Sequence, residues 1–114
     1  MTMNQLLILR DQIHDYFESN KACQASFRDP DAYAAYYTSK YLIQDTCEAM
    51  MAHRHAGFSS SYSIAYLEFW GIMQAIIVQQ DAIYELHKAI IGMYPKPNDR
   101  PNWHELRKLR NVCA

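Results

Sequence analysis

The sequence predicts an all-α protein that folds as an up-down bundle of four helices, in a single domain spanning residues 1–114. Three observations lead to this prediction. Half of the residues are hydrophobic, so the chain can fill one core. Glycine and proline are rare, with three and four residues, which favours helices over a turn-rich β fold. Apolar residues also recur every three to four positions, as they do along one face of a helix.

The first two helices are expected at residues 3–24 and at about residues 30–55. The first is indicated by apolar side chains at helical spacing, namely Leu6, Leu9, Ile13, Tyr16 and Phe17. The second starts after Asp29, because aspartate caps a helix and Pro30 is tolerated at its first position. Its expected core positions are Tyr36, Ile43, Cys47 and Met50.

Tyr33, Tyr37 and Tyr41 form a second stripe on the helix at residues 30–55. Aromatic rings at this spacing can stack with nucleic-acid bases. A tyrosine stripe is more commonly the edge of a core or a subunit interface, where its hydroxyls reach water. Both interpretations stay open at this point.

The third helix, expected at about residues 63–91, is the longest of the four. Gly57 can end the helix before it, Ser61 or Ser63 can cap it, and Gly92 can end it. Its apolar stripe is expected at Phe69, Met73, Ile76, Gln80, Ile83, Tyr84, His87, Ile90 and Ile91.

Gln80 and His87 are polar residues within this apolar stripe, and Asp81 lies on its flank. A buried glutamine or histidine side chain needs a hydrogen-bond partner. Gln80 is either a core residue that fixes the helix register or, like Asp81, a support for an arginine from another helix.

The last helix is expected at residues 103–114, after a turn at residues 93–101 that contains three prolines. Asn102 and Glu105 can form a capping box at its start. One side of this helix is apolar and consists of Trp103, Leu106, Leu109 and Cys113. The helix is short beside the third one, so we expect a truncated helix, with a native chain that continues past Ala114 or a chain that is a fragment.

Arg110 lies within the apolar arc of the last helix, and Arg107 lies at its edge. Burying a charge without a partner is costly, so Arg110 is expected to reach water, to pair with a core carboxylate or to bind an anion. Residues 93–114 carry five Lys or Arg and two Asp or Glu, whereas residues 1–92 carry six and ten. This locally positive segment suits an anionic ligand, although the net charge of −1 argues against a general electrostatic binder of nucleic acid.

Leu109, Arg110 and Asn111, in a helical chain whose third helix carries Gln79 to Ala82, resemble part of the motif of the HEPN (higher eukaryotes and prokaryotes nucleotide-binding) family. That motif is an arginine, commonly followed by asparagine, and then a histidine further along the helix. The resemblance implies an HEPN-like bundle from a metal-independent endoribonuclease of toxin or defence type, or an RNA- or nucleotide-binding protein. The expected site consists of Arg110 and Asn111 for catalysis and of Gln80, Asp81, Arg107 and His87 for binding or support.

In the chemistry that this resemblance implies, the arginine stabilises charge on phosphorus and the histidine takes the proton of a ribose 2′-hydroxyl. No histidine follows Arg110 in this sequence, and His104 points to a different side of the helix. We therefore expect little or no ribonuclease activity from the 114-residue chain. The alternative is a non-catalytic homodimeric interaction or regulatory domain.

The expected partners are a second copy of the chain, RNA or a nucleotide, and an antitoxin or other partner protein. No cofactor and no metal are expected, because His53 and His55 point to different sides of a helix and the cysteines have no zinc spacing. Cys23, Cys47 and Cys113 are widely spaced, which fits a reduced cytoplasmic setting. No signal peptide is expected, and no stretch approaches the ~20 apolar residues of a membrane helix.

Overall fold

The computed structural model describes residues 2–19, 27–96, 105 and 108. Across these residues the chain forms three helices and no strand: α1 (Met3–Ser19), α2 (Pro30–Ala56) and α3 (Tyr62–Ile91). The predicted all-α class is therefore confirmed. The fourth helix, expected at residues 103–114, falls largely outside the described residues, but Glu105 and Lys108 within it are helical.

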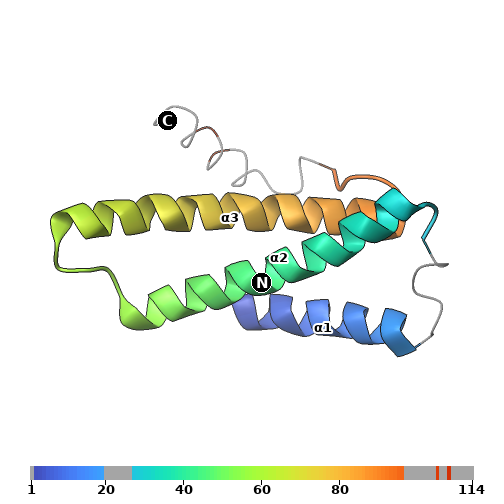
Figure 1. Ribbon diagram of the computed structural model, residues 1–114, viewed down its shortest axis with the longest axis horizontal. Helices are drawn as coiled ribbons and strands as arrows, with labels where there is room; N and C mark the ends of the chain where they lie inside the picture. Colours follow the sequence, from blue (N-terminus) through green and yellow to red (C-terminus); the bar gives the residue numbers. More distant parts are fainter. Residues whose placement is uncertain (1, 20–26, 97–104, 106–107, 109–114) are drawn as a thin grey trace.

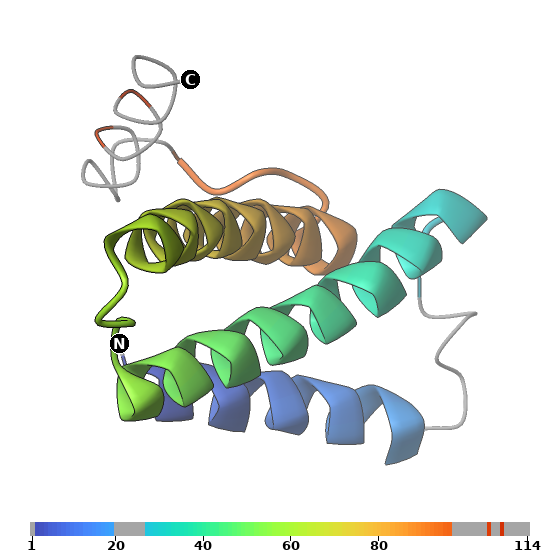
Figure 2. The ribbon, with the colours of Figure 1, turned by 60° about the vertical axis from the view of Figure 1, so that its left-hand side comes forward.

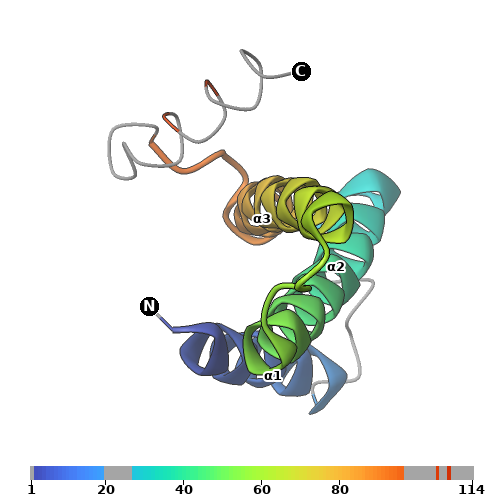
Figure 3. The same cartoon turned by 90° about the vertical axis from the view of Figure 1, so that its left-hand side faces the viewer.

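α2 is the central helix of the fold and contacts both of the others. In Figure 1 it crosses diagonally between α1 and α3, and the turned view in Figure 2 shows the same order. The end-on view in Figure 3 shows α1 and α3 on either side of α2 and apart from each other. The three described helices therefore form two packed pairs that share α2, and one side between α1 and α3 is left open.

The ends of α2 and α3 follow the signals expected from the sequence. Oδ1 of Asp29 accepts a hydrogen bond from the N–H of Ala32 at 2.7 Å, which caps α2. Gly57 follows α2 with a φ of 75°, and Gly92 follows α3 in the left-handed region with a φ of 99°. Glycine adopts these angles without the steric cost of a Cβ atom. Ser61 precedes α3, but its side chain makes no capping hydrogen bond.

The core lies between α2 and α3 and extends to α1 through aromatic rings. Its buried members are Phe27, Ala32, Tyr36, Ile43, Cys47, Ala82, Leu86 and Ala89. Three of the predicted core positions of α2 are among them, and Met50 is half-buried. α1 contributes partly buried side chains such as Phe17, whose ring centroid lies 5.0 Å from that of Phe27 and 5.1 Å from that of Tyr36.

The core positions predicted for α1 and α3 were partly wrong. Leu9 and Tyr16 of α1 are exposed, and so are Phe69, Ile90 and Ile91 of α3. Met73 and Gln80 are buried as predicted, but the other buried residues of α3 are Ile77, Gln79, Ala82, Leu86 and Ala89. The reason is geometrical, because α2 packs against a face of α3 that is displaced from the most apolar stripe. That stripe faces the open side of the fold.

Candidate binding groove between α1 and α3

A groove of about 710 Å³ lies between α1 and α3, with α2 at its base. Most of its lining is apolar. The main apolar residues are Leu6, Leu9 and Ile13 of α1, Ile43 and Met50 of α2, and Ile76, Ile83, Leu86, Ile90 and Ile91 of α3. A concave, mostly apolar site of this size is typical of a place where a ligand or a further structural element binds.

The apolar stripes expected from the sequence therefore meet at this groove. Leu9 and Ile91 line it and are 43% and 61% exposed, so apolar area remains in water here. Covering such area stabilises a protein by roughly 25 cal/mol for each Å². The groove is consequently a side of the fold that gains stability from an additional partner.

Five polar side chains interrupt the apolar walls of the groove: Thr2, Arg10, Gln79, Gln80 and His87. Gln79 and Gln80 are both buried. The Nε2 of Gln79 donates to Oγ1 of Thr46 at 3.2 Å and to Sγ of Cys47 at 3.1 Å. Burial raises the pKa of the Cys47 thiol, so the thiol stays protonated at neutral pH. Gln79 is thus engaged in the interior of the protein.

The ring of His87 is oriented by the chain that follows α3. Its Nδ1 lies 2.7 Å from the carbonyl oxygen of Met93. A carbonyl oxygen only accepts hydrogen bonds, so Nδ1 carries the proton. In the neutral ring Nε2 is then the acceptor, and it is the atom with which His87 can bind a donor group.

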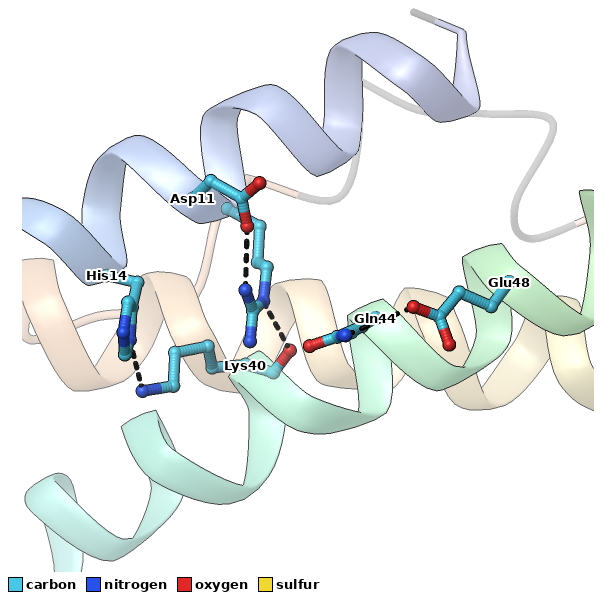
Figure 4. A network of polar contacts seen from close by, with 6 residues as sticks. Asp11, His14, Lys40, Gln44 and Glu48 are labelled. Carbon is cyan, nitrogen blue, oxygen red and sulfur yellow. Dashed lines mark hydrogen bonds and ion pairs between the residues drawn. The ribbon is translucent and has the colours of Figure 1, made fainter.

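Arg10 is held on the groove wall by two hydrogen bonds. Its Nε donates to the carbonyl oxygen of Lys40 at 3.2 Å, and its Nη1 donates to Oδ1 of Asp11 at 2.7 Å. Figure 4 shows the surrounding network, in which His14 of α1 contacts the side chain of Lys40 of α2 and Asp11 holds the guanidinium group of Arg10. Nζ of Lys40 donates to Nδ1 of His14 at 2.7 Å. These bonds join α1 to α2 and fix a cation beside the groove.

Lys40 is 1% exposed, and its ammonium group is surrounded by aromatic rings. Nζ lies 5.1, 4.4 and 5.1 Å from the ring centroids of Tyr36, Tyr37 and Tyr41, within the range of cation–π attraction. Along the stripe, the ring plane of Tyr37 is tilted by 51° to that of Tyr33 and by 52° to that of Tyr41. A hydrogen bond with Tyr41 raises the pKa of Tyr37. The stripe is therefore better explained as a core edge around a lysine than as a platform for bases.

Lys40 and Arg10 were not singled out from the sequence. A signal for Lys40 was present, because it lies four, three and one positions from Tyr36, Tyr37 and Tyr41 on the same helix. No comparable signal marks Arg10, since its partner is a backbone carbonyl on another helix.

Two of the expected site residues, Gln80 and His87, lie together in the groove. Asp81 is exposed and faces a different, shallower hollow between α2 and α3, with Thr38 among its neighbours. Arg107, Arg110 and Asn111 are outside the described residues.

His53 of α2 contacts Glu68 of α3 near the connection between the two helices. Its Nε2 lies 2.8 Å from Oε2 of Glu68, whereas His55 is exposed. In the described part of the chain, no three His, Cys, Asp or Glu residues are grouped so that they could hold a metal ion. None of the described helices is both long enough and apolar enough to span a bilayer.

Comparisons with known proteins give this groove no precedent. The chain matches no family model, no curated protein and no solved structure. The resemblance to HEPN proteins therefore rests on the sequence positions named above.

Proposed function

We propose that residues 103–114 form the fourth helix of an HEPN-like up-down bundle and that this helix fills the groove. The apolar walls contributed by α1, α2 and α3 support this proposal. Glu105 and Lys108 support it too, because both are helical and form an i,i+3 ion pair at 3.4 Å. The lengths also agree: a helix over 103–114 is about 18 Å long, and the groove follows α3 from Ile76 to Ile91, about 22 Å.

The proposed register of this helix places Trp103 beside His87. Trp103 and Arg110 are seven residues apart, about two helical turns, and so are Gln80 and His87. An antiparallel helix with Trp103 level with His87 therefore has Arg110 level with Gln80. The amide oxygen of Gln80 can then accept a hydrogen bond from the guanidinium group.

We infer that the assembled site binds a nucleotide or a short RNA through its phosphate. Arg110 supplies the charge and the bidentate geometry that phosphate favours, and Arg10, whose guanidinium group pairs with Asp11, adds N–H donors on the wall formed by α1. Asn111 and Arg107 are adjacent supports. The observation that carries this proposal is that Gln80 and His87 lie seven residues apart in the mostly apolar lining of the groove.

The proposed function is binding without cleavage of the RNA. Internal attack by a ribose 2′-hydroxyl needs a proton acceptor within hydrogen-bond reach of that hydroxyl. Within the 114 residues no histidine follows Arg110, so we expect this chain to bind RNA without cleaving it. Nδ1 of His87 donates to the carbonyl oxygen of Met93 and Nε2 stays an acceptor, and the role proposed for His87 is support of the site. The expected activity is therefore recognition of the phosphate by a fixed arginine.

Docking of the last helix is tested by the fluorescence of Trp103. The protein has two tryptophans, so a Trp70→Phe background leaves Trp103 as the reporter. We expect blue-shifted emission that moves to the red when Ile83→Glu places a charge in the groove. Ile8→Glu is the matched control, because Ile8 is 56% exposed on α1 and does not line the groove. Emission typical of a water-exposed indole in the Trp70→Phe protein contradicts the docking.

Phosphate recognition is tested by fluorescence anisotropy with labelled single-stranded RNA. Arg110→Ala should weaken binding about tenfold or more, because a charge-assisted bidentate contact is lost. Lys108→Ala removes the same charge from an exposed position and should change the affinity by no more than about twofold. Equal losses of affinity in both variants contradict phosphate recognition by Arg110. Cleavage of the RNA that depends on Arg110 contradicts the proposal of binding without cleavage.

A second function, a non-catalytic interaction or regulatory domain with a protein partner such as an antitoxin, is favoured by exposed apolar side chains at the start of α3. The melting temperature separates the two functions. A ligand that binds only the folded state raises it, so inorganic phosphate and adenosine monophosphate should do so for a nucleotide site. A melting temperature that neither ligand changes favours the interaction domain.

A further inference from the structure

The first turns of α3 carry an exposed apolar face, here called the aromatic face and defined by Tyr62, Tyr66, Leu67, Phe69 and Trp70. At about 100° per residue these five side chains lie within one half of the helix circumference. The first four are between 47% and 89% exposed, and Trp70 is half-buried. Figure 1 shows that this end of α3 extends beyond α1, which therefore leaves it uncovered.

The rings of the aromatic face pack on one another and are not drawn into the core. The ring centroid of Trp70 lies 6.3 Å from that of Tyr66 and 6.1 Å from that of Phe69, in edge-to-face geometry. None of these residues belongs to the core cluster of the described structure. The face is thus a preassembled apolar patch of the kind that marks an interaction site.

Charge is almost absent along this part of α3. Among the fully described residues 62–80, Glu68 is the one charged residue. Its Oε2 accepts hydrogen bonds from the backbone N–H of Ser59 at 3.3 Å and from the Nε2 of His53 at 2.8 Å. The carboxylate therefore faces the α2–α3 connection, and a helix that is apolar on several sides is typically enclosed by other protein.

We propose that the aromatic face packs against the same face of a second copy of this chain, across a two-fold axis. A neutral surface is complementary to itself, because no like charges meet at the axis. The net charge of −1 also keeps the repulsion between two copies small. A charged partner would instead have to bury its own charges against aromatic rings at a cost.

The area of the aromatic face sets the expected affinity of the dimer. An aromatic side chain can bury about 150–250 Å², so five partly exposed residues supply on the order of 500 Å² for each copy. The total of about 1,000 Å² is at the lower limit for a specific interface. The dimer is therefore reversible, with a dissociation constant in the micromolar range. It is independent of the proposed phosphate site, because on α3 the groove begins at Ile76.

Sedimentation equilibrium of the full chain over a range of concentrations tests the proposal. We expect the mass to rise from the 13.4 kDa of the monomer toward about twice that value. Tyr66→Glu places a charge at the centre of the face and should raise the dissociation constant about tenfold or more. The matched control is Ile8→Glu, since Tyr66 is 59% exposed and Ile8 is 56% exposed. The control should change the constant by no more than about twofold.

Circular dichroism of both variants checks that the helices are retained. A wild-type chain that stays monomeric up to about 500 µM overturns the proposal, because an interface of this size associates below that concentration. A dimer that Ile8→Glu dissociates as strongly as Tyr66→Glu overturns it as well. Tyr66→Glu should keep the RNA affinity of the wild type. Arg110→Ala should lose RNA binding and keep the dimer mass. This pair of readouts distinguishes failure of the phosphate site from failure of the dimer.

Discussion

α2 and α3 meet through buried side chains, whereas α1 is attached to α2 without a single buried residue of its own. α2 and α3 each contribute seven buried residues. α1 contributes half-buried apolar residues, one aromatic contact region around Phe17, and the hydrogen bonds of Arg10 and His14 to Lys40. The α2–α3 pair is therefore stabilised mainly by the hydrophobic effect, and the attachment of α1 depends strongly on specific polar geometry.

The two kinds of attachment respond differently to substitution. Buried apolar packing gives a graded loss when a methyl group is removed, because the cavity only partly collapses. A polar anchor instead fails when one atom is removed, because the partner group remains without its bond. α1 forms one wall of the groove, so the polar anchor also determines the shape of the proposed site.

The largest effect is expected in the α2–α3 interior. Ile43 is 1% exposed, and Ile43→Ala should lower the free energy of unfolding by about 3 kcal/mol, through lost transfer energy and a cavity. Its neighbour Leu42 is 37% exposed, so Leu42→Ala should cost less than about 1 kcal/mol. Urea denaturation followed by circular dichroism measures both. Equal losses would show that the α2–α3 interior is not the stable part of the molecule.

An intermediate effect is expected at the anchor of α1. Lys40→Met keeps the apolar stem but removes the ammonium group from the tyrosine rings and from Nδ1 of His14, so we expect a loss of about 1–2 kcal/mol. Hydrogen exchange should accelerate in α1 and stay slow in the buried parts of α2 and α3. Lys88→Met is the control, because Lys88 lies 4.6 Å from the ring of the exposed Tyr94. Uniform acceleration in all three helices would refute the idea of a separately attached α1.

The smallest effect is a dependence on pH at Cys47, where the start of α1 meets the other two helices. Sγ of Cys47 lies 3.6 Å from Sδ of Met3, and burial raises the thiol pKa above its ordinary value of 9.0. The unfolded thiol releases its proton first, so rising pH favours unfolding. The stabilising contribution is complete below the ordinary pKa and is lost as the pH rises through the folded pKa. Unfolding curves between neutral and alkaline pH should fall more steeply for the wild type than for Cys47→Ala, and equal slopes would rule the contribution out.

The helices were predictable because their signals are local. Asp29 and Pro30 indicate the start of α2 in the sequence, and Gly57 and Gly92 indicate the ends of α2 and α3. The buried face of α3 was not predictable to the same degree, since apolar spacing identifies a face but not the neighbour that covers it. Ile76, Ile83 and Ile90 follow the predicted stripe, yet they face the groove.

In the candidate site, too, local signals were visible in the sequence and contacts between distant residues were not. Gln80 and His87 could be found because a polar residue in an apolar stripe is visible in the sequence. The contribution of Arg10 could not be found, because it arises from a hydrogen bond between residues thirty positions apart. Asp81, adjacent to Gln80 in sequence, lies on another side of α3, as the 100° rotation per residue requires.

The short connection between α2 and α3 has a consequence for the order of folding. Five residues, 57–61, join the two helices, so their contacts close a small loop and form at little cost in chain entropy. α1 precedes this hairpin in the chain, and its partly buried apolar side chains gain their packing partners only when α2 is present. During synthesis α1 therefore emerges before the hairpin but becomes ordered after it, and an amphipathic helix remains exposed to chaperones until the hairpin behind it is complete.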